Sequence, residues 1–145
     1  MFLSFFRILE FRSNPASFRV IAENDFHGKC VLSTSTIRLF DGRTLLLTSS
    51  TDGHIALWNL SSFLSHGDGN GVNKPVFEPF WNVLVHQTGV NAVDVTTIDR
   101  NVVVASGGDD SSVVLTVLEW ETEYPCPSIA FQKRNGLAHS AQVTG

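Results

Sequence analysis

A histidine, a run of hydroxyl residues and an aspartate recur at a fixed spacing, and these residue types could do hydrolytic chemistry. His27 precedes the stretch TSSTDGHIALWNL at 48–60, which contains Thr48, Ser50 and Asp52. A serine hydrolase joins an exposed hydroxyl to His and Asp and adds an oxyanion hole. The same groups could instead form a buried hydrogen-bonded network that stabilises a sheet, with a Trp indole as a further donor.

The pattern repeats along the chain. Three segments share a His, three residues and a Val: HGKCV at 27–31, HQTGV at 86–90 and HSAQV at 139–143. His27 lies 25 positions before Asp52, and His86 lies 24 positions before Asp110, with Ser106 among the small residues between them. Two motifs in one register, twice, predict a repeat architecture. The sequence has no G-x-S-x-G elbow to expose a nucleophile.

Alternating apolar and polar residues around these motifs predict strands, and no segment has a convincing helical period. The predicted strands are 30–40, 43–50, 54–60 and 76–85 in the first unit, and 90–98, 102–108, 112–120 and 128–134 in the second. Asp41-Gly42 and Asp52-Gly53 are tight-turn signals. The Gly-, Ser- and Asn-rich segment 61–75 predicts an exposed insertion, and 119–128 is the extra material of the second unit.

Composition limits the classes of function. The chain has 145 residues, 43% hydrophobic and 17% charged, with a formal net charge of −4. This composition fits one ordinary folded domain, and the chain lacks a basic field for a phosphate backbone. The apolar start is interrupted by Arg7 and Glu10, so we expect a soluble, cytoplasmic protein without a signal peptide. Cys30 and Cys126 are expected to be buried free thiols.

The motifs resemble the WD40 repeat, in which a His comes early, a Ser or Thr and an Asp lie midway, and Trp-Asp closes the unit. The first unit matches well, with Asn59 in place of the usual Asp, whereas Thr116 stands where the second unit should have Trp. The fold class that this resemblance implies is all-β, a partial β-propeller of about two and a half four-stranded antiparallel blades. The resemblance also implies a structural hydrogen-bond network in each unit, made of His27, Thr48, Ser50, Asp52 and Trp58, and of His86, Ser106 and Asp110.

The predicted organisation follows from the repeats. Residues 1–26 are the last strands of a preceding blade, 27–85 a blade with the inserted loop 61–75, 86–138 a degenerate blade, and 139–145 the start of a third. A propeller needs about 4–8 blades to close. The remaining blades are therefore needed for closure, and we expect this chain alone to be poorly stable or self-associating.

Two phrases, NDFHGKCVLS at 24–33 and GLAHSAQVTG at 136–145, resemble segments of the WD-repeat protein 6 family. That resemblance implies a fragment of a larger, non-catalytic scaffold that binds a tRNA ribose 2′-O-methyltransferase acting on the anticodon loop. It implies that the chain contacts tRNA only indirectly and binds no cofactor, because the partner would hold the methyl donor. A generic WD40 adaptor in ubiquitin ligation, trafficking or signalling is the alternative, and an enzyme using the Ser, His and Asp set is a third hypothesis.

Other candidate sites are weaker. The glycines of HGDGNG at 66–71 are not followed by Gly-Lys-Ser/Thr, so they do not predict a phosphate loop. Asp109 and Asp110 more simply form a turn than a metal site, and no two histidines have ligand spacing. The aromatic residues Phe77, Phe80, Trp81 and Trp120 could form an exposed binding patch, but we expect them to cover the core between blades.

Overall fold

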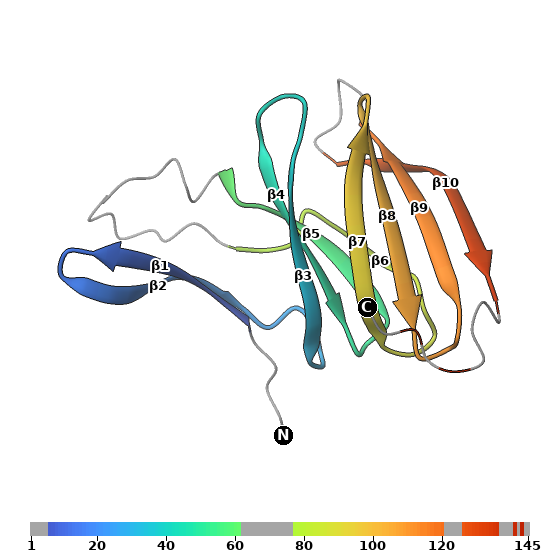
Figure 1. Ribbon diagram of the computed structural model, residues 1–145, viewed down its shortest axis with the longest axis horizontal. Helices are drawn as coiled ribbons and strands as arrows, with labels where there is room; N and C mark the ends of the chain where they lie inside the picture. Colours follow the sequence, from blue (N-terminus) through green and yellow to red (C-terminus); the bar gives the residue numbers. More distant parts are fainter. Residues whose placement is uncertain (1–5, 62–76, 121–125, 137–140, 142, 144–145) are drawn as a thin grey trace.

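The computed structural model describes residues 6–61, 77–120, 126–136, 141 and 143, which form antiparallel sheets (Figure 1). The strands are β1 (Phe6–Ser13), β2 (Ala16–Asn24), β3 (Val31–Arg38), β4 (Thr44–Ser50), β5 (His54–Asn59), β6 (Trp81–Leu84), β7 (Val90–Ile98), β8 (Asn101–Gly108), β9 (Val113–Glu119) and β10 (Ser128–Asn135). β1 and β2 form a two-stranded hairpin, and two four-stranded sheets have the orders β3-β4-β5-β6 and β7-β8-β9-β10. This architecture confirms the predicted partial propeller of about two and a half blades.

The first blade, β3 to β6, is a simple meander in which each strand pairs with the next one along the chain. Gly42 and Gly53 both have positive φ, 87° and 86°, in the two tight turns that the Asp-Gly pairs predict. Only glycine adopts this backbone conformation without strain. The turns therefore fix the register in which Leu47 pairs with Leu57 and Leu46 with Trp58.

The second blade, β7 to β10, repeats the first blade down to its irregularities. A β-bulge lies between Val31 and Ser33 in the first blade and between Val90 and Ala92 in the second. In the second blade Asp99 and Ser111 occupy turns with positive φ where the first blade has glycine. The shared bulge positions show that the sequence repeat is also a repeat of backbone geometry.

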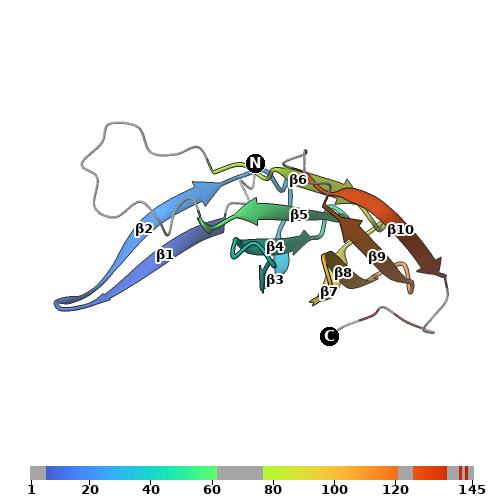
Figure 2. The ribbon, with the colours of Figure 1, turned by 90° about the horizontal axis from the view of Figure 1, so that it is seen from above.

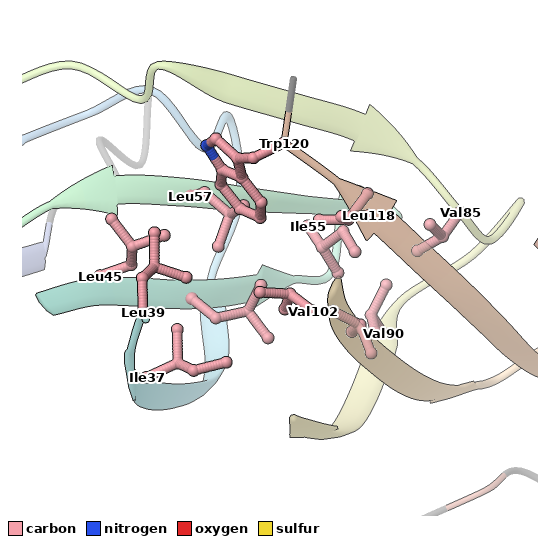
Figure 3. Packing of buried hydrophobic residues seen from close by; sticks show 12 residues of the cluster. Ile37, Leu39, Leu45, Ile55, Leu57, Val85, Val90, Val102, Leu118 and Trp120 are labelled. Atoms are coloured by element: carbon pink, nitrogen blue, oxygen red, sulfur yellow. The ribbon is translucent and has the colours of Figure 1, made fainter. Parts of the chain in front are cut away.

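The main hydrophobic core lies between the two blades (Figure 3). One face of the first blade contributes Leu45, Leu47, Ile55 and Leu57, and the facing side of the second blade contributes Val102, Val104, Leu118 and Trp120. The first strands of the two blades, β3 and β7, also contact each other. Because burial of apolar surface is the main favourable term in folding, this core makes the two blades one packed body.

A second core joins the β1–β2 hairpin to the opposite face of the first blade. Phe6 and Ile8 pack against Leu46, Trp58 and Phe77. The Trp58 ring stacks on Phe77 at 4.8 Å and meets Phe6 edge-to-face at 4.8 Å. Seen from above, the hairpin reaches outward past the first blade (Figure 2).

Some details differ from the sequence prediction. The fourth strand of the first blade covers only Trp81–Leu84 rather than 76–85, because Phe77 turns into the second core and the Phe80 N–H bonds to the Leu57 carbonyl. Phe77 and Trp120 are buried and Phe80 and Trp81 partly buried, which confirms that these aromatic residues serve the core. The predicted insertion, apart from Ser61, lies outside the described residues, as does His139.

Within the described residues, no helix has the length and apolar character needed to cross a membrane.

Candidate functional site

The first polar cluster connects the loop before β3 to β4 and β5 through a chain of hydrogen bonds. His27 Nδ1 lies 3.2 Å from Asp52 Oδ2, and His27 Nε2 lies 2.8 Å from Thr48 Oγ1. Trp58 Nε1 donates to the same Thr48 oxygen at 2.9 Å. The structure therefore brings together four residues whose positions span 27 to 58 in the sequence.

The donors in this cluster determine where the protons lie. An indole N–H can only donate, so Thr48 Oγ1 accepts from Trp58. The ionised Asp52 carboxylate can only accept, so His27 Nδ1 carries the imidazole proton and donates it to Asp52 Oδ2. In a neutral imidazole Nε2 is then an acceptor, and the Thr48 hydroxyl donates its proton to it. The neutral imidazole is satisfied at both nitrogens.

The resemblance implied either Thr48 or Ser50 as the hydroxyl that bonds His27, and Ser50 bonds elsewhere. Its hydroxyl oxygen accepts from the Asp52 backbone N–H at 3.3 Å, and its side chain is fully buried. The hydroxyl that bonds His27 is that of Thr48. Ser50 thus shapes the turn that holds the aspartate.

The second blade contains an equivalent cluster with an altered set of donors. His86 Nδ1 lies 2.9 Å from Asp110 Oδ1, and His86 Nε2 lies 3.0 Å from Ser106 Oγ. The Ser112 hydroxyl bonds the same carboxylate oxygen of Asp110 at 2.5 Å. Arg134, on β10, donates to Asp110 Oδ2 at 2.8 Å, and to the Val85 carbonyl.

Sequence reasoning missed Ser112, Gln132 and Arg134. Thr116, which replaces the Trp, is buried and its hydroxyl accepts from Gln132 Nε2 at 3.0 Å. The register of β9 and β10, which pairs Gln132 with Thr116 and Arg134 with Val114, brings these residues to the cluster, and no local sequence pattern signals it. A polar residue on the outermost strand can reach across to the position where an indole is absent.

Burial and hydrogen bonding act in opposite directions on the two carboxylates. Burial raises the pKa of Asp52, but hydrogen bonds from the His54 backbone N–H and from His27 outweigh it and lower the pKa on balance. Burial also raises the pKa of Asp110, but hydrogen bonds from Ser112, His86 and Arg134 outweigh it and hold the pKa far below its usual range. Burial lowers the pKa of His27, against the opposing attraction of Asp52. These directions favour carboxylates beside a neutral His27.

Neither cluster is arranged for catalysis. The side chains that would serve as nucleophile and base are almost completely buried, with exposed fractions of 0% for Thr48, 3% for Ser106 and 1% for each histidine. A nucleophile must reach its substrate. What these groups can do is satisfy one another, because an unpaired buried polar group costs about 1–3 kcal/mol.

The segment that carries His86 also contacts the first blade. The backbone N–H groups of Val85 and His86 both donate to the Gly53 carbonyl, at 3.0 and 3.2 Å. A Cβ on Gly53 would collide with the His86 carbonyl oxygen, and one on Gly108 would lie 2.5 Å from His86 Nδ1. The His86 backbone is therefore hydrogen-bonded to the first blade, whereas its side chain is hydrogen-bonded within the second.

The described residues offer little support for metal-binding or thiol chemistry. In the ranges 6–61, 77–120 and 126–136, no group of three or more His, Cys, Asp or Glu side chains could hold a metal ion. Cys30 and Cys126 are free but exposed, so the expectation of buried thiols is wrong. Cys30 lies in a connecting segment before β3, and Cys126 Sγ donates to the Phe80 carbonyl at the surface.

Comparison with known proteins connects this arrangement to one group of relatives. The chain is 29% identical to the Pongo abelii protein named tRNA (34-2′-O)-methyltransferase regulator WDR6, over 88% of this chain and 13% of that protein. The proteins of the same name from Homo sapiens and Bos taurus are 30% and 26% identical, over 71% and 96% of this chain and 10% and 14% of theirs. No protein-family model matches the chain. The chain thus resembles a segment of these WD-repeat regulators, and it spans about an eighth of their length.

Proposed function

We propose that this chain is a non-catalytic WD40 scaffold segment that supports 2′-O-ribose methylation in the tRNA anticodon loop by binding a methyltransferase partner. The observation that carries the proposal is the similarity, over 71–96% of the chain, to proteins named as regulators of a tRNA (34-2′-O)-methyltransferase. A partial propeller agrees with a regulatory rather than a chemical role. The activity of the whole relatives enters only as part of this proposal.

The burial of both polar clusters supports the non-catalytic part of the proposal. Their Ser and Thr hydroxyls are turned into the blades, where they bond histidine rather than meet solvent. In this scheme the partner enzyme supplies the catalytic groups and holds the methyl donor, and this chain binds no cofactor. The chain acts by positioning its partner.

The charge of the chain bears on how tRNA is handled. Its formal net charge is −4, which does not favour direct contact with a phosphate backbone. We therefore place tRNA on the partner enzyme, with indirect contact to this chain. We also propose that the complex is cytoplasmic.

The first test is affinity purification of the intact chain from its native cell, followed by mass spectrometry. A ribose methyltransferase enriched with the wild-type chain, and lost with a Trp58→Ala chain whose first blade is destabilised, is the expected result. Recovery of a ubiquitin-ligase, trafficking or signalling assembly without a methyltransferase would instead support a generic WD40 adaptor.

A second test separates the scaffold from an enzyme. Purified methyltransferase is assayed for 2′-O-methylation of tRNA with and without this chain, and we expect stimulation only when both proteins are present. His27→Ala should weaken that stimulation in proportion to the loss of folded protein. An activity of the chain alone that His27→Ala abolishes while leaving the fold intact would overturn the non-catalytic assignment.

A further inference from the structure

Two tight turns of neighbouring blades meet at the end of the strands opposite the histidine clusters. β3 leads away from His27 into the β3–β4 turn, and β7 leads away from His86 into the β7–β8 turn (Figure 1). The Cζ atom of Arg100, in the second turn, lies over the Phe40 ring of the first turn, 5.2 Å from its centroid. Phe40 is nevertheless 53% exposed, so this contact leaves about half of the side chain open to solvent.

A second arginine lies close to the same ring. Arg38 is the last residue of β3, is exposed, and precedes Phe40 by two positions. At the rise of an extended chain, their Cα atoms are about 7 Å apart. We call Arg38, Phe40 and Arg100 the turn patch. It presents an aromatic ring beside two guanidinium groups, and both residue types are enriched in protein–protein interfaces.

The turn patch is exposed for a reason other than the ends of the chain. Arg38 pairs with Thr44 as Thr97 pairs with Val102, so Thr97 holds the equivalent position in the second blade. The side chains on that side of β7 pack against the first blade, and Thr97 is still exposed. The tip of the β3–β4 turn, residues 40–42, is likewise exposed beside the second blade. A neighbouring blade therefore leaves this end of the strands open to solvent.

Both arginines of the turn patch keep donors for an external acceptor. The Asp41 carboxylate, in the same turn as Phe40, is taken by Arg43, whose backbone N–H bonds Oδ1 at 2.9 Å and whose Nε bonds Oδ2 at 2.7 Å. In the part of the chain that the structure describes, no carboxylate forms an ion pair with Arg38 or Arg100. A guanidinium that lies over a ring keeps its N–H groups in its own plane, where they can still bind an acceptor.

The chemistry of the turn patch defines what it can hold. An arginine fork matches a carboxylate in shape and binds it through two parallel N–H···O bonds. The half-exposed ring of Phe40 gains by contact with an apolar side chain. The patch therefore fits two carboxylates with an apolar side chain between them.

Charge favours a protein segment over a nucleic acid at this surface. Three arginines, Arg38, Arg43 and Arg100, stand here against two aspartates, Asp41 and Asp99, in a chain whose formal net charge is −4. A nucleic acid carries a charge on every phosphate, and its backbone is held by several basic contacts. A peptide needs to bring only the two carboxylates that the arginines bind. The small local excess of positive charge thus suits a short acidic segment.

We propose that the turn patch is a docking surface for an extended acidic segment of a partner protein, in which two carboxylates flank an apolar side chain. The carboxylates bind Arg38 and Arg100, and the apolar side chain covers the exposed part of the Phe40 ring. The surface lies at the other end of the strands from both histidine clusters. The proposal does not depend on the function proposed above.

The experiment measures the fluorescence anisotropy of labelled peptides titrated with the 145-residue chain. The peptides carry two Glu residues around one Leu or Phe, at separations of one to three positions, in a Gly-Ser background. Each has a matched peptide with Gln in place of both Glu. We expect an acidic peptide of this set to bind about tenfold or more tightly than its Gln counterpart, and its binding to weaken as salt is added.

Three variants, Arg38→Gln, Phe40→Ala and Arg100→Gln, test the contacts one at a time. Each changes an exposed side chain, so the fold should be unaffected, and circular dichroism checks this. We expect each variant to raise the Kd of the acidic peptide by about tenfold. Arg7→Gln is the matched control, because it removes the same charge at an exposed position on β1 and should leave the Kd unchanged.

Three results would overturn the proposal. The first is a set of acidic peptides that bind no better than their Gln counterparts. The second is an equal loss of binding in Arg7→Gln, which would show a response to net charge rather than to the turn patch. The third is tighter binding of labelled hexauridine that depends on the same three residues, which would assign the turn patch to single-stranded nucleic acid.

Discussion

The two blades build the same histidine cluster with different donors. In the first blade the Trp58 indole N–H donates to the Thr48 hydroxyl, which bonds one nitrogen of His27, and the other nitrogen of His27 bonds the Asp52 carboxylate. In the second blade the indole is absent, and Ser112 and Arg134 bond the carboxylate from the other end. In both blades the buried histidine and aspartate keep their hydrogen-bond partners, but the residues that supply the other donors differ.

The largest expected difference between the blades comes from removing the residue that distinguishes them. Trp58→Ala deletes a fully buried ring that packs on Phe6 and Phe77 and leaves the Thr48 hydroxyl with one partner fewer. We expect the free energy of unfolding to fall by about 3–5 kcal/mol, measured by urea denaturation at a concentration where the chain is monomeric.

The matched change in the second blade is Thr116→Ala, which removes a small buried side chain and its bond from Gln132. We expect a loss of about 1 kcal/mol. Equal losses in the two variants would show that the blades do not differ in the way that the structure indicates.

Removing the central histidine tests the network directly. His27→Ala leaves the Thr48 hydroxyl and the Asp52 carboxylate without their shared partner, and we expect a loss of about 2–4 kcal/mol in the free energy of unfolding. His54→Ala changes a partly exposed histidine beside the same carboxylate and should cost much less. A small effect of His27→Ala would argue that the network adds little to stability.

Restoring the missing indole should not stabilise the second blade. Thr116 is 1% exposed, and Thr116→Trp inserts a large ring into space that neighbouring side chains already fill. We expect overpacking to lower the free energy of unfolding by about 1–3 kcal/mol. A gain in stability, measured in the same urea titration, would mean that the second blade has simply lost a favourable residue without adjusting to it.

Arg134→Met removes the donor that is peculiar to the second blade and keeps much of the apolar stem. Asp110 then loses one hydrogen bond, and the Val85 carbonyl loses another. We expect a loss of about 1 kcal/mol, because the arginine is partly exposed. Arg38→Met, at an exposed position of β3 in the first blade, is the control and should leave the free energy of unfolding unchanged.

The smallest expected effect is on how the free energy of unfolding depends on pH. His27 has a pKa below its ordinary 6.5, so its contribution is complete above pH 6.5 and is lost as the pH falls toward the folded-state pKa. Asp52 and Asp110 also have lowered pKa values, so their contributions hold above about pH 4 and are lost below it. We expect His27→Gln to flatten the upper part of this profile, between about pH 7 and pH 5, in urea titrations at several pH values. A wild-type profile that is flat over that interval would contradict the assignment.

Much of the fold could be predicted because its determinants are local. Asp41-Gly42 and Asp52-Gly53 carry their turn geometry in their own residue types, and period-two alternation of burial is visible along β3. The pairs of His27 with Asp52 and of His86 with Asp110 followed from repeat spacing combined with the family resemblance.

The parts that escaped prediction depend on residues brought together from distant segments. Arg134 reaches Asp110 only because β10 pairs with β9 in one register, and single-sequence patterns give no such register. The exposure of Cys30 and Cys126 and the turn of Phe77 into the core were likewise decided by what packs nearby. Tertiary packing overrides local preference in these places.

The Gly53 carbonyl, which accepts the N–H groups of both Val85 and His86, has a consequence for how the molecule comes apart. The first blade cannot lose its turn at Gly53 without also releasing the backbone that aims the His86 ring into the second. Stability in repeat proteins is approximately a sum of the unit stabilities and the couplings between neighbours. Here the coupling passes through a single loop that is hydrogen-bonded to both blades. We therefore expect the two blades to unfold together, so that a single sequence repeat is not an independent folding unit.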